Sequence, residues 1–218
     1  MKIVLAAATL AEIKPFIDQT GLQIGVWQKQ QKVELFILIT GIGSPATAIE
    51  LSALLARNPI DLLLNIGIAG TYNSNLALGS LTEVIAESLP IGAWEQETIW
   101  NDHFDQKLTD PNSFPYTEKY LLPVTSHWKT GLPKVKAITI QQIETIPERI
   151  TALQQHYNAD VESMEGAAIF FASQKFQVPA MQIRAISNLC GVRDKQQWQL
   201  KEAVQALNNW LLTFLNQW

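Results

Sequence analysis

Short apolar runs along the chain alternate with longer stretches in which apolar positions recur at helical spacing. Residues 60–66 are mainly apolar, which is typical of a strand buried on both faces. A regular alternation of such strands with amphipathic helices predicts a sheet covered by helices on both faces. We therefore expect an α/β fold with a central mixed, twisted sheet.

The same patterns give the individual elements. The sequence predicts strands over residues 2–7, 22–27, 33–40, 60–66, 78–87, 120–124, 135–140, 159–161 and 180–187, with a polar turn over 28–32. It predicts helices over residues 9–18, 44–57, 146–156, 164–175 and 194–216. Ser44 and Pro45 suit the N-cap and the first helical position of the second helix.

Residues 88–134 interrupt this alternation. They are rich in Pro, Asn, Asp and aromatic residues and show little periodicity. Irregular segments of this length are usually functional or disordered, and the Trp and Phe content argues against disorder. We expect an ordered, irregular segment that contributes to the surface of a homo-oligomer.

Composition and charge narrow the class of protein. The 218 residues suffice for a single domain spanning 1–218, and they contain no internal repeat or linker. A net charge of -4 without a basic run argues against a nucleic-acid surface. One cysteine, Cys190, and three scattered histidines leave no disulfide framework and no zinc cluster. We expect a protein without a metal or cofactor. The apolar start of the chain is too short for a signal peptide, so we also expect a cytoplasmic location and no membrane partner.

Glu12 follows the first predicted strand, where ligands bind in open α/β sheets. The spacing Thr9-x-x-Glu12 is also a capping box, in which the glutamate reaches back to the backbone of Thr9. On local sequence alone, capping is favoured about two to one. A general base at the edge of a cleft is the alternative.

Two glycine-rich motifs end neighbouring strands. Thr40 and Gly41 open the first motif, TGIG, and Gly67 lies within the second, NIGIAG. The first half-matches a dinucleotide-binding pattern, but that pattern belongs to the first strand–helix unit. Glycines that let the backbone approach a small ligand closely are the simpler interpretation, with tight turns as the alternative.

Two carboxylates and an amide follow later strands. Glu162 and Glu165 lie near the N-terminus of a predicted helix. The default role of Glu162 is to complement the helix dipole, whereas Glu165 lies in tight space suited to a pair of ribose hydroxyls. Arg184 lies in an apolar strand and therefore needs a buried partner, for which a structural ion pair is favoured. Asn188 ends that strand, as a ligand contact or a turn residue.

Taken together, these segments resemble the nucleoside phosphorylase/nucleosidase superfamily, and within it the hydrolase branch that includes the methylthioadenosine/S-adenosylhomocysteine nucleosidases and the futalosine hydrolases. The likeness spans nearly the whole chain, except residues 88–134. Each motif is weak alone, but the ordered set is specific. It consists of Glu12, Thr40-Gly41-Ile42-Gly43, Asn65-Ile66-Gly67-Ile68-Ala69-Gly70, Ser163-Met164-Glu165-Gly166-Ala167-Ala168 and Arg184-Ala185-Ile186-Ser187.

The resemblance implies hydrolysis of the N-glycosidic bond of a purine nucleoside. It implies that Glu12 activates the attacking water, Met164 packs against the sugar and base, and Glu165 binds the ribose hydroxyls. The position of Asn188 is usually Asp in the adenine-specific nucleosidases, where it protonates N7 of the base. An amide donates hydrogen bonds but no catalytic proton, so Asn188 permits hypoxanthine, the better leaving group, without excluding adenine.

Asn188, together with Gly191-Val192-Arg193-Asp194 and Trp198, resembles the futalosine hydrolases in particular. This resemblance implies removal of hypoxanthine from futalosine in an alternative menaquinone pathway. The carboxyphenyl ketone arm of futalosine needs an apolar slot with a cation at its end, for which aromatic residues of 88–134 and Arg193 are candidates. The alternatives are a methylthioadenosine/S-adenosylhomocysteine nucleosidase, a phosphorylase and a binding module. A phosphorylase normally has an arginine beside the early glycine loops to bind phosphate, and no arginine precedes Arg57 in this sequence.

Overall fold

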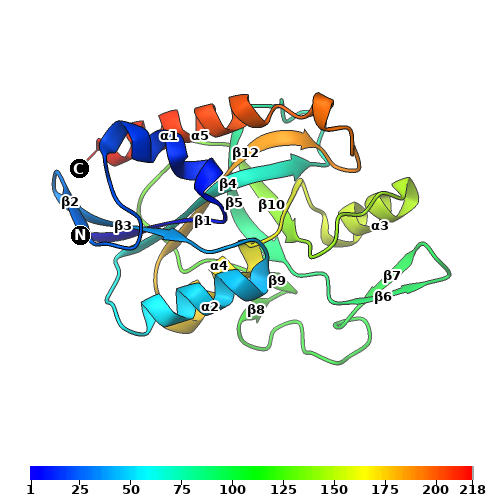
Figure 1. Ribbon diagram of the computed structural model, residues 1–218. Helices are drawn as coiled ribbons and strands as arrows, with labels where there is room; N and C mark the ends of the chain where they lie inside the picture. Colours follow the sequence, from blue (N-terminus) through cyan, green and yellow to red (C-terminus); the bar gives the residue numbers. More distant parts are fainter. Residues whose placement is uncertain (218) are drawn as a thin grey trace.

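A mixed sheet forms the centre of the molecule, in a computed structural model that describes residues 1–217 (Figure 1). Within those residues it has ten strands in the order β2-β3-β1-β4-β11-β10-β5-β9-β8, with β12 pairing both β4 and β5. The strands of this sheet are β1 (Lys2–Ala7), β2 (Gln28–Gln30), β3 (Val33–Ile39), β4 (Leu62–Thr71), β5 (Leu81–Ser88), β8 (Tyr116–Thr117), β9 (Tyr120–Leu121), β10 (Lys134–Thr139), β11 (Val161–Ser163) and β12 (Ala180–Leu189). A separate hairpin joins β6 (Gly92–Glu95) to β7 (Ile99–Asp102).

Strand β12 closes part of the sheet on itself. It runs parallel to β4 and antiparallel to β5, while β4, β11, β10 and β5 are already neighbours in that order. These five strands therefore form a ring, with β1, β3 and β2 extending from β4. The predicted mixed α/β sheet is confirmed, and the closure is an addition that the pattern of strands did not indicate.

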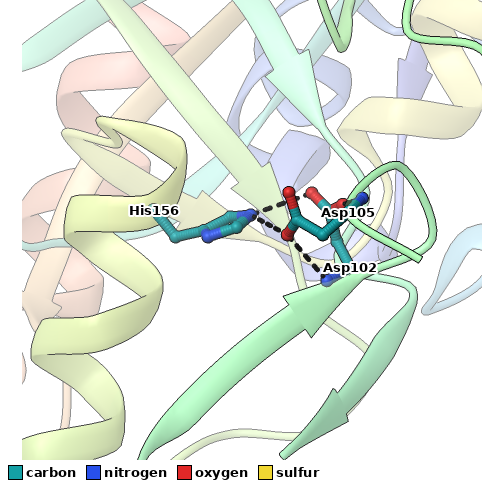
Figure 2. Close-up of side chains that lie close together, drawn as sticks. All are labelled: Asp102, Asp105 and His156. Atoms are coloured by element: carbon teal, nitrogen blue, oxygen red, sulfur yellow. Dashed lines mark hydrogen bonds and ion pairs between the residues drawn. The ribbon is translucent and has the colours of Figure 1, made fainter. Parts of the chain in front are cut away.

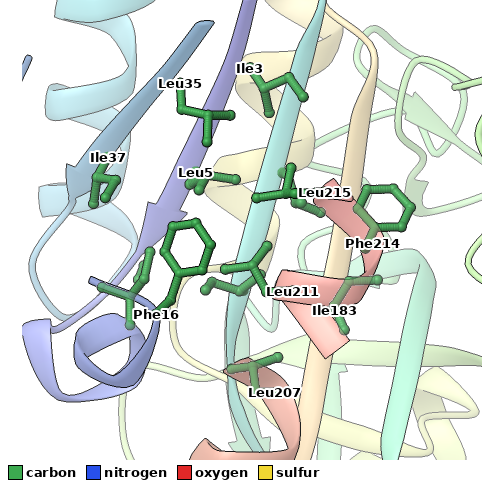
Figure 3. Packing of buried hydrophobic residues seen from close by; sticks show 14 of the residues in the cluster. Ile3, Leu5, Phe16, Leu35, Ile37, Ile183, Leu207, Leu211, Phe214 and Leu215 are labelled. Atoms are coloured by element: carbon green, nitrogen blue, oxygen red, sulfur yellow. The ribbon is translucent and has the colours of Figure 1, made fainter. Parts of the chain in front are cut away.

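Helices cover both faces of this sheet, as predicted (Figure 1). One face carries α1 (Leu10–Thr20) and α5 (Leu200–Leu215), and the other carries α2 (Ser44–Leu55) and α4 (Gly166–Phe176). Figure 3 shows how Phe16 of α1 and Leu211 of α5 pack with strand residues such as Leu5 in the first of these layers. Burial of such apolar surface is the main source of stability.

The remaining helix, α3 (Pro147–Tyr157), lies beside the sheet and contacts the β6–β7 hairpin. Trp100 of the hairpin donates a hydrogen bond to the Tyr157 hydroxyl (2.8 Å). His156 Nε2 lies 2.9 Å from the buried carboxylate of Asp102 and 3.4 Å from that of Asp105 (Figure 2). This cluster was not predicted, because it brings His156 beside two aspartates that lie more than fifty positions earlier in the chain.

A side chain of α5 bonds to the backbone of helix α1 beside a proline. Pro15 lies inside α1, and the Phe16 N–H donates to Oδ1 of Asn208 (3.0 Å). Asn208 Nδ2 in turn donates to the carbonyl oxygen of Glu12 (2.8 Å). A single buried amide of α5 therefore bonds to two backbone groups of α1, one on each side of Pro15.

Several predicted elements were wrong in position. The strand expected over residues 22–27 is absent because Gly21 and Gly25 both have positive φ, and the edge strand β2 forms instead in the expected turn. Gly43, not Ser44, is the N-cap of α2, since the Ser44 hydroxyl donates to the Met164 carbonyl oxygen.

The final helix and the middle segment also differ from expectation. The predicted helix over 194–216 begins only at Leu200, after a short 3₁₀ turn (Lys195–Gln197) capped by Asp194. Residues 88–134 hold the β6–β7 hairpin as well as β8 and β9, so the segment is less irregular than predicted. None of the helices formed by residues 1–217 has the length and apolar character needed to cross a membrane.

Candidate active site

A cavity of about 360 Å³ opens at the ends of several strands. Its lining comes from the β1–α1 connection, the end of β4, the β11–α4 junction, the end of β12 and residues 191–204. Glu12, Met164, Glu165 and Asn188 all line it. The structure therefore brings together four side chains that are up to 176 positions apart in the chain.

Glu12 uses its two carboxylate oxygens for different purposes. Oε2 accepts hydrogen bonds from the backbone N–H and the hydroxyl of Thr9 (2.9 and 3.0 Å), so the capping role exists. Oε1 accepts from the backbone N–H of Ile68 (3.1 Å), which fixes the carboxylate against the end of β4. Capping and a place in the cavity are compatible for this residue.

Burial raises the pKa of Glu12, and the Ile68 N–H, the charge of Arg184 and the hydrogen bonds from Thr9 offset this only in part. A general base works best when its pKa lies near the pH at which it operates. The environment of Glu12 therefore shifts the carboxylate toward the basicity that deprotonation of water requires.

Glu165 lies at the N-terminus of α4, of which it is the N-cap residue. Its Oε1 accepts a hydrogen bond from the Gly43 N–H (2.8 Å) across the cavity wall. Gly166 follows, and a Cβ at that glycine would overlap the carboxylate of Glu87. The small residue lets α4 begin close to the sheet, which places the Glu165 carboxylate at the cavity.

Asn188 occupies the end of β12, where the pairing with β4 shifts register between Ile186 and Asn188. Its Oδ1 accepts a hydrogen bond from the Ser187 hydroxyl (2.8 Å), and its Nδ2 donates to the Leu189 carbonyl (3.0 Å). An amide nitrogen carries two hydrogens. The second hydrogen of Nδ2 is available to an acceptor on a ligand.

Thr40, Gly41 and Gly67 lie close behind the cavity but are not among its lining residues. The Thr40 hydroxyl accepts a hydrogen bond from Thr47 (3.2 Å) and is buried. Gly41 has a φ of 80°, so it makes the turn that leads to Gly43. A Cβ at Gly67 would overlap the Arg184 guanidinium and lie 2.9 Å from Glu12 Oε1.

Arg184 lies behind the site with Glu87 and Gln182. The ion pair predicted for Arg184 is absent among residues 1–217; its guanidinium donates to Gln182 Oε1 instead. Glu87 accepts hydrogen bonds from Thr139 (2.8 Å) and Gln182 (3.0 Å). Burial raises the pKa of Glu87 to about 7, against the lowering effect of the Arg184 charge and these hydrogen bonds.

Glu162 lines the cavity, whereas the sequence predicted that it would complement the dipole of the following helix. The helix it was expected to complement begins at Gly166, and Glu162 lies in β11 opposite Gly70 of β4. The Tyr72 hydroxyl donates a hydrogen bond to its Oε2, and the Cys190 thiol lies beside the carboxyl. Burial raises the pKa of Glu162, and these two neighbours offset the effect only in part.

The apolar lining of the cavity does not come from the segment that was predicted to form a slot for a 5′ arm. No residue of 88–134 lines the cavity. Apolar side chains from other segments line it instead, namely Ile42, Ile68, Ile140, Ile143, Trp198 and Leu200. Arg193 is exposed and follows directly after the lining residue Val192.

Comparison with known proteins identifies the family. The model of the phosphorylase superfamily matches residues 3–216. The chain belongs to the phosphorylase superfamily. Among relatives in this superfamily, it is 30% identical to a futalosine hydrolase of Thermus thermophilus over 203 residues, which cover 88% of this chain and 86% of the relative. It is also 30% identical to a futalosine hydrolase of Streptomyces coelicolor over 182 residues, or 79% and 75% of the two chains.

A solved structure shows the same superfamily fold. A futalosine hydrolase mutant of Helicobacter pylori aligns over the full length of both chains, with a TM-score of 0.80 and 19% identity. This likeness confirms the predicted α/β fold with its mixed sheet.

Proposed function

We propose that this enzyme hydrolyses the N-glycosidic bond of futalosine and releases hypoxanthine. The observation that carries the proposal is that Glu12, Met164, Glu165 and Asn188 line one cavity. The futalosine hydrolases to which the chain is 30% identical support the choice of substrate, as does an amide at position 188, which suits a 6-oxopurine.

In the proposed mechanism, water attacks the anomeric carbon as the bond to the base breaks through an oxocarbenium-like transition state. Glu12 orients the water and accepts its proton. Glu165 binds the ribose hydroxyls, and Met164 packs against the sugar and base. Asn188 donates a hydrogen bond to the departing base, where a preorganised dipole stabilises developing negative charge.

The charges of the cavity favour water over phosphate as the nucleophile. Three glutamates and no lysine or arginine are found among the described residues that line it. A phosphate dianion needs cationic or convergent N–H donors, and arginine is the usual choice. Carboxylates repel such an anion, so this cavity suits hydrolysis rather than phosphorolysis.

The substrate's 5′ arm lies, in this proposal, along the apolar part of the lining near Trp198. The exposed Arg193 at the edge of the cavity then meets the carboxylate of the arm, since a guanidinium pairs well with a planar carboxylate. Replacing Arg193 with Gln is expected to raise KM for futalosine while leaving kcat nearly unchanged.

The deciding experiment compares futalosine with methylthioadenosine, because a methylthioadenosine/S-adenosylhomocysteine nucleosidase is the main alternative. The purified enzyme is incubated with each nucleoside without phosphate, and the free base is measured. We expect faster release of hypoxanthine from futalosine. Faster release of adenine from methylthioadenosine would favour the alternative, and a requirement for phosphate would show a phosphorylase.

A Glu12→Gln variant tests the assignment of the base. Its turnover of futalosine should fall by roughly 10²–10⁴-fold, the usual contribution of general acid–base catalysis. The exposed Glu50, on α2, provides the matched control, and Glu50→Gln should retain wild-type turnover. Near-normal activity of Glu12→Gln would remove Glu12 from the mechanism.

The wider setting is part of the same proposal. The reaction serves an alternative menaquinone pathway in the cytoplasm, where a reducing environment suits the unpaired Cys190. The enzyme is a homo-oligomer. Exposed apolar residues such as Leu108 and Phe114 in the middle segment support a protein interface there, and light scattering of the purified protein measures the number of subunits.

A further inference from the structure

Glu162 is the lining carboxylate to which the proposed mechanism gives no role. It is 9% exposed, and no ion pair to Glu162 is found within the described part of the chain. A buried carboxylate without a cation is costly in its charged form. The group therefore holds its proton more firmly than an ordinary glutamate.

The position of Glu162 relative to Asn188 is set by the strands beside them. Both flank Gly70 of β4: a Cβ built on this glycine would lie 3.4 Å from Glu162 Cγ and 3.2 Å from Asn188 Nδ2. Glu162 and Asn188 thus project into the same part of the cavity. A base held by the Asn188 amide has Glu162 as its neighbouring acid.

Two hydrogen-bonding groups orient the carboxyl. The Tyr72 hydroxyl donates to Oε2 of Glu162, which leaves Oε1 as the oxygen able to carry a proton. The Cys190 thiol lies beside the same carboxyl group of Glu162. Burial raises the pKa of both Tyr72 and Cys190, so these neighbours stay neutral. Neither side chain can carry a positive charge that would favour the ionised form of Glu162.

We propose that Glu162 is the catalytic acid that protonates the departing purine. The inference rests on the proposed function, in which Asn188 replaces the acid expected of an adenine-specific nucleosidase. The proposed acid lies across β4 from Asn188: β11 supplies the proton, and β12 supplies the amide that holds the base.

The proton and electron balance of the step is complete. The C1′–N9 bond breaks and its electron pair leaves with the base, while a lone pair of the water oxygen forms the new bond to C1′. Glu12 accepts the proton of the water, and the O–H of Glu162 gives its proton to the base at its N7/O6 edge. Neutral hypoxanthine departs, after which Glu12 releases a proton to solvent and Glu162 takes one up.

The pH dependence that follows involves every titratable group near Glu162. Tyr72 and Cys190 contact the carboxyl, and Glu12 and Glu165 line the same cavity from α1 and the start of α4. Because the acid must be protonated to act, kcat should decline as the pH rises above the pKa of Glu162. The Tyr72 hydrogen bond lowers that pKa, so its removal should move the decline to higher pH.

The test uses the full-length enzyme with futalosine and records kcat from pH 5 to pH 9. In Glu162→Gln, which can donate a hydrogen bond but not a proton, kcat should fall by roughly 10²–10⁴-fold. The remaining activity should lose the decline at high pH. In Tyr72→Phe, activity should persist with the decline displaced to higher pH. Thermal unfolding and binding of hypoxanthine verify that both variants keep a folded cavity.

Glu83→Gln is the matched control, because Glu83 on β5 also accepts a hydrogen bond from a hydroxyl, that of Thr130 (2.5 Å), but does not line the cavity. It should retain wild-type kcat and pH profile. The proposal is overturned if folded Glu162→Gln keeps kcat within tenfold of wild type, or if its decline at high pH is unchanged. Failure of the wild type to release hypoxanthine from futalosine instead refutes the proposed substrate, and the same profile is then recorded with whichever purine nucleoside it cleaves.

Discussion

Gly67 is a position at which a single added methyl group should disturb the site. An alanine there places a methyl group against the Arg184 guanidinium and 2.9 Å from Glu12 Oε1. Arg184 is 2% exposed and has no free space into which it can move. Glu12, 8% exposed, can move only into the cavity, away from its hydrogen bond with the Ile68 N–H. Overpacking of a buried site costs about 1–3 kcal/mol, and we expect the free energy of unfolding to fall by that amount.

Activity should fall by more than the loss of stability explains. The added methyl group displaces the Glu12 carboxylate, which activates water in the proposed mechanism, and the loss of general base catalysis is worth roughly 10²–10⁴-fold in kcat. Urea unfolding measures the stability of Gly67→Ala, and hypoxanthine release from futalosine measures kcat at a temperature at which the variant is fully folded.

Gly79→Ala provides the control for destabilisation alone. Gly79 has a φ of 80°, and a Cβ there would meet only Glu202 Cβ at 3.9 Å. The alanine costs about 1–2 kcal/mol because of its positive φ. It meets neither Glu12 nor Arg184, and Gly79 does not line the cavity, so kcat should be unchanged. A Gly67→Ala enzyme with wild-type stability, or with reduced stability but unchanged kcat, would refute the close packing of Glu12 and Arg184 described above.

Three further predictions concern separate groups. Asn188→Asp should increase adenine release from methylthioadenosine at least tenfold, and an unchanged rate would contradict the role given to the amide. The folded-state pKa of Glu87 is raised to about 7, so its contribution to stability is full below pH 4.5 and is lost as the pH rises through 7; Glu87→Gln should remove this decline from urea unfolding curves measured at each pH. Burial alone raises the pKa of Asp102, but the hydrogen bonds from His156 and the neighbouring backbone lower it overall; Asp102→Asn should therefore cost about 1–3 kcal/mol at pH 7, and the difference from wild type should shrink only as the pH falls below 3.8 and through this lowered pKa.

The sequence predicted the elements whose signals are local. The strand β1 and the helix α1 follow from apolar spacing and the Thr9–Glu12 capping pattern. The hairpin β6–β7 was missed because its stability comes from distant contacts, such as that between Trp100 and Tyr157. Apolar spacing over 22–27 was misleading because two glycines bend the chain there.

The candidate site shows the same division. Motif order indicated Glu12, Glu165 and Asn188, but only the fold shows that Glu12 Oε1 meets the Ile68 N–H. Glu162 was assigned to a helix end because its sequence neighbours suggested one. Its true partner positions, Gly70 and Tyr72, are ninety residues away, and strand register alone brings them together.

The amide bridge from Asn208 makes the first helix of the chain dependent on the last. Asn208 holds the carbonyl of Glu12 and the N–H of Phe16, and no residue nearer in sequence replaces it. During synthesis, β1 and α1 can form early. The backbone around Glu12, the proposed general base, gains its hydrogen bonds with Asn208 only when α5 docks. Catalytic competence should therefore appear last in folding, and partial release of α5 should silence the enzyme while most of the sheet remains intact.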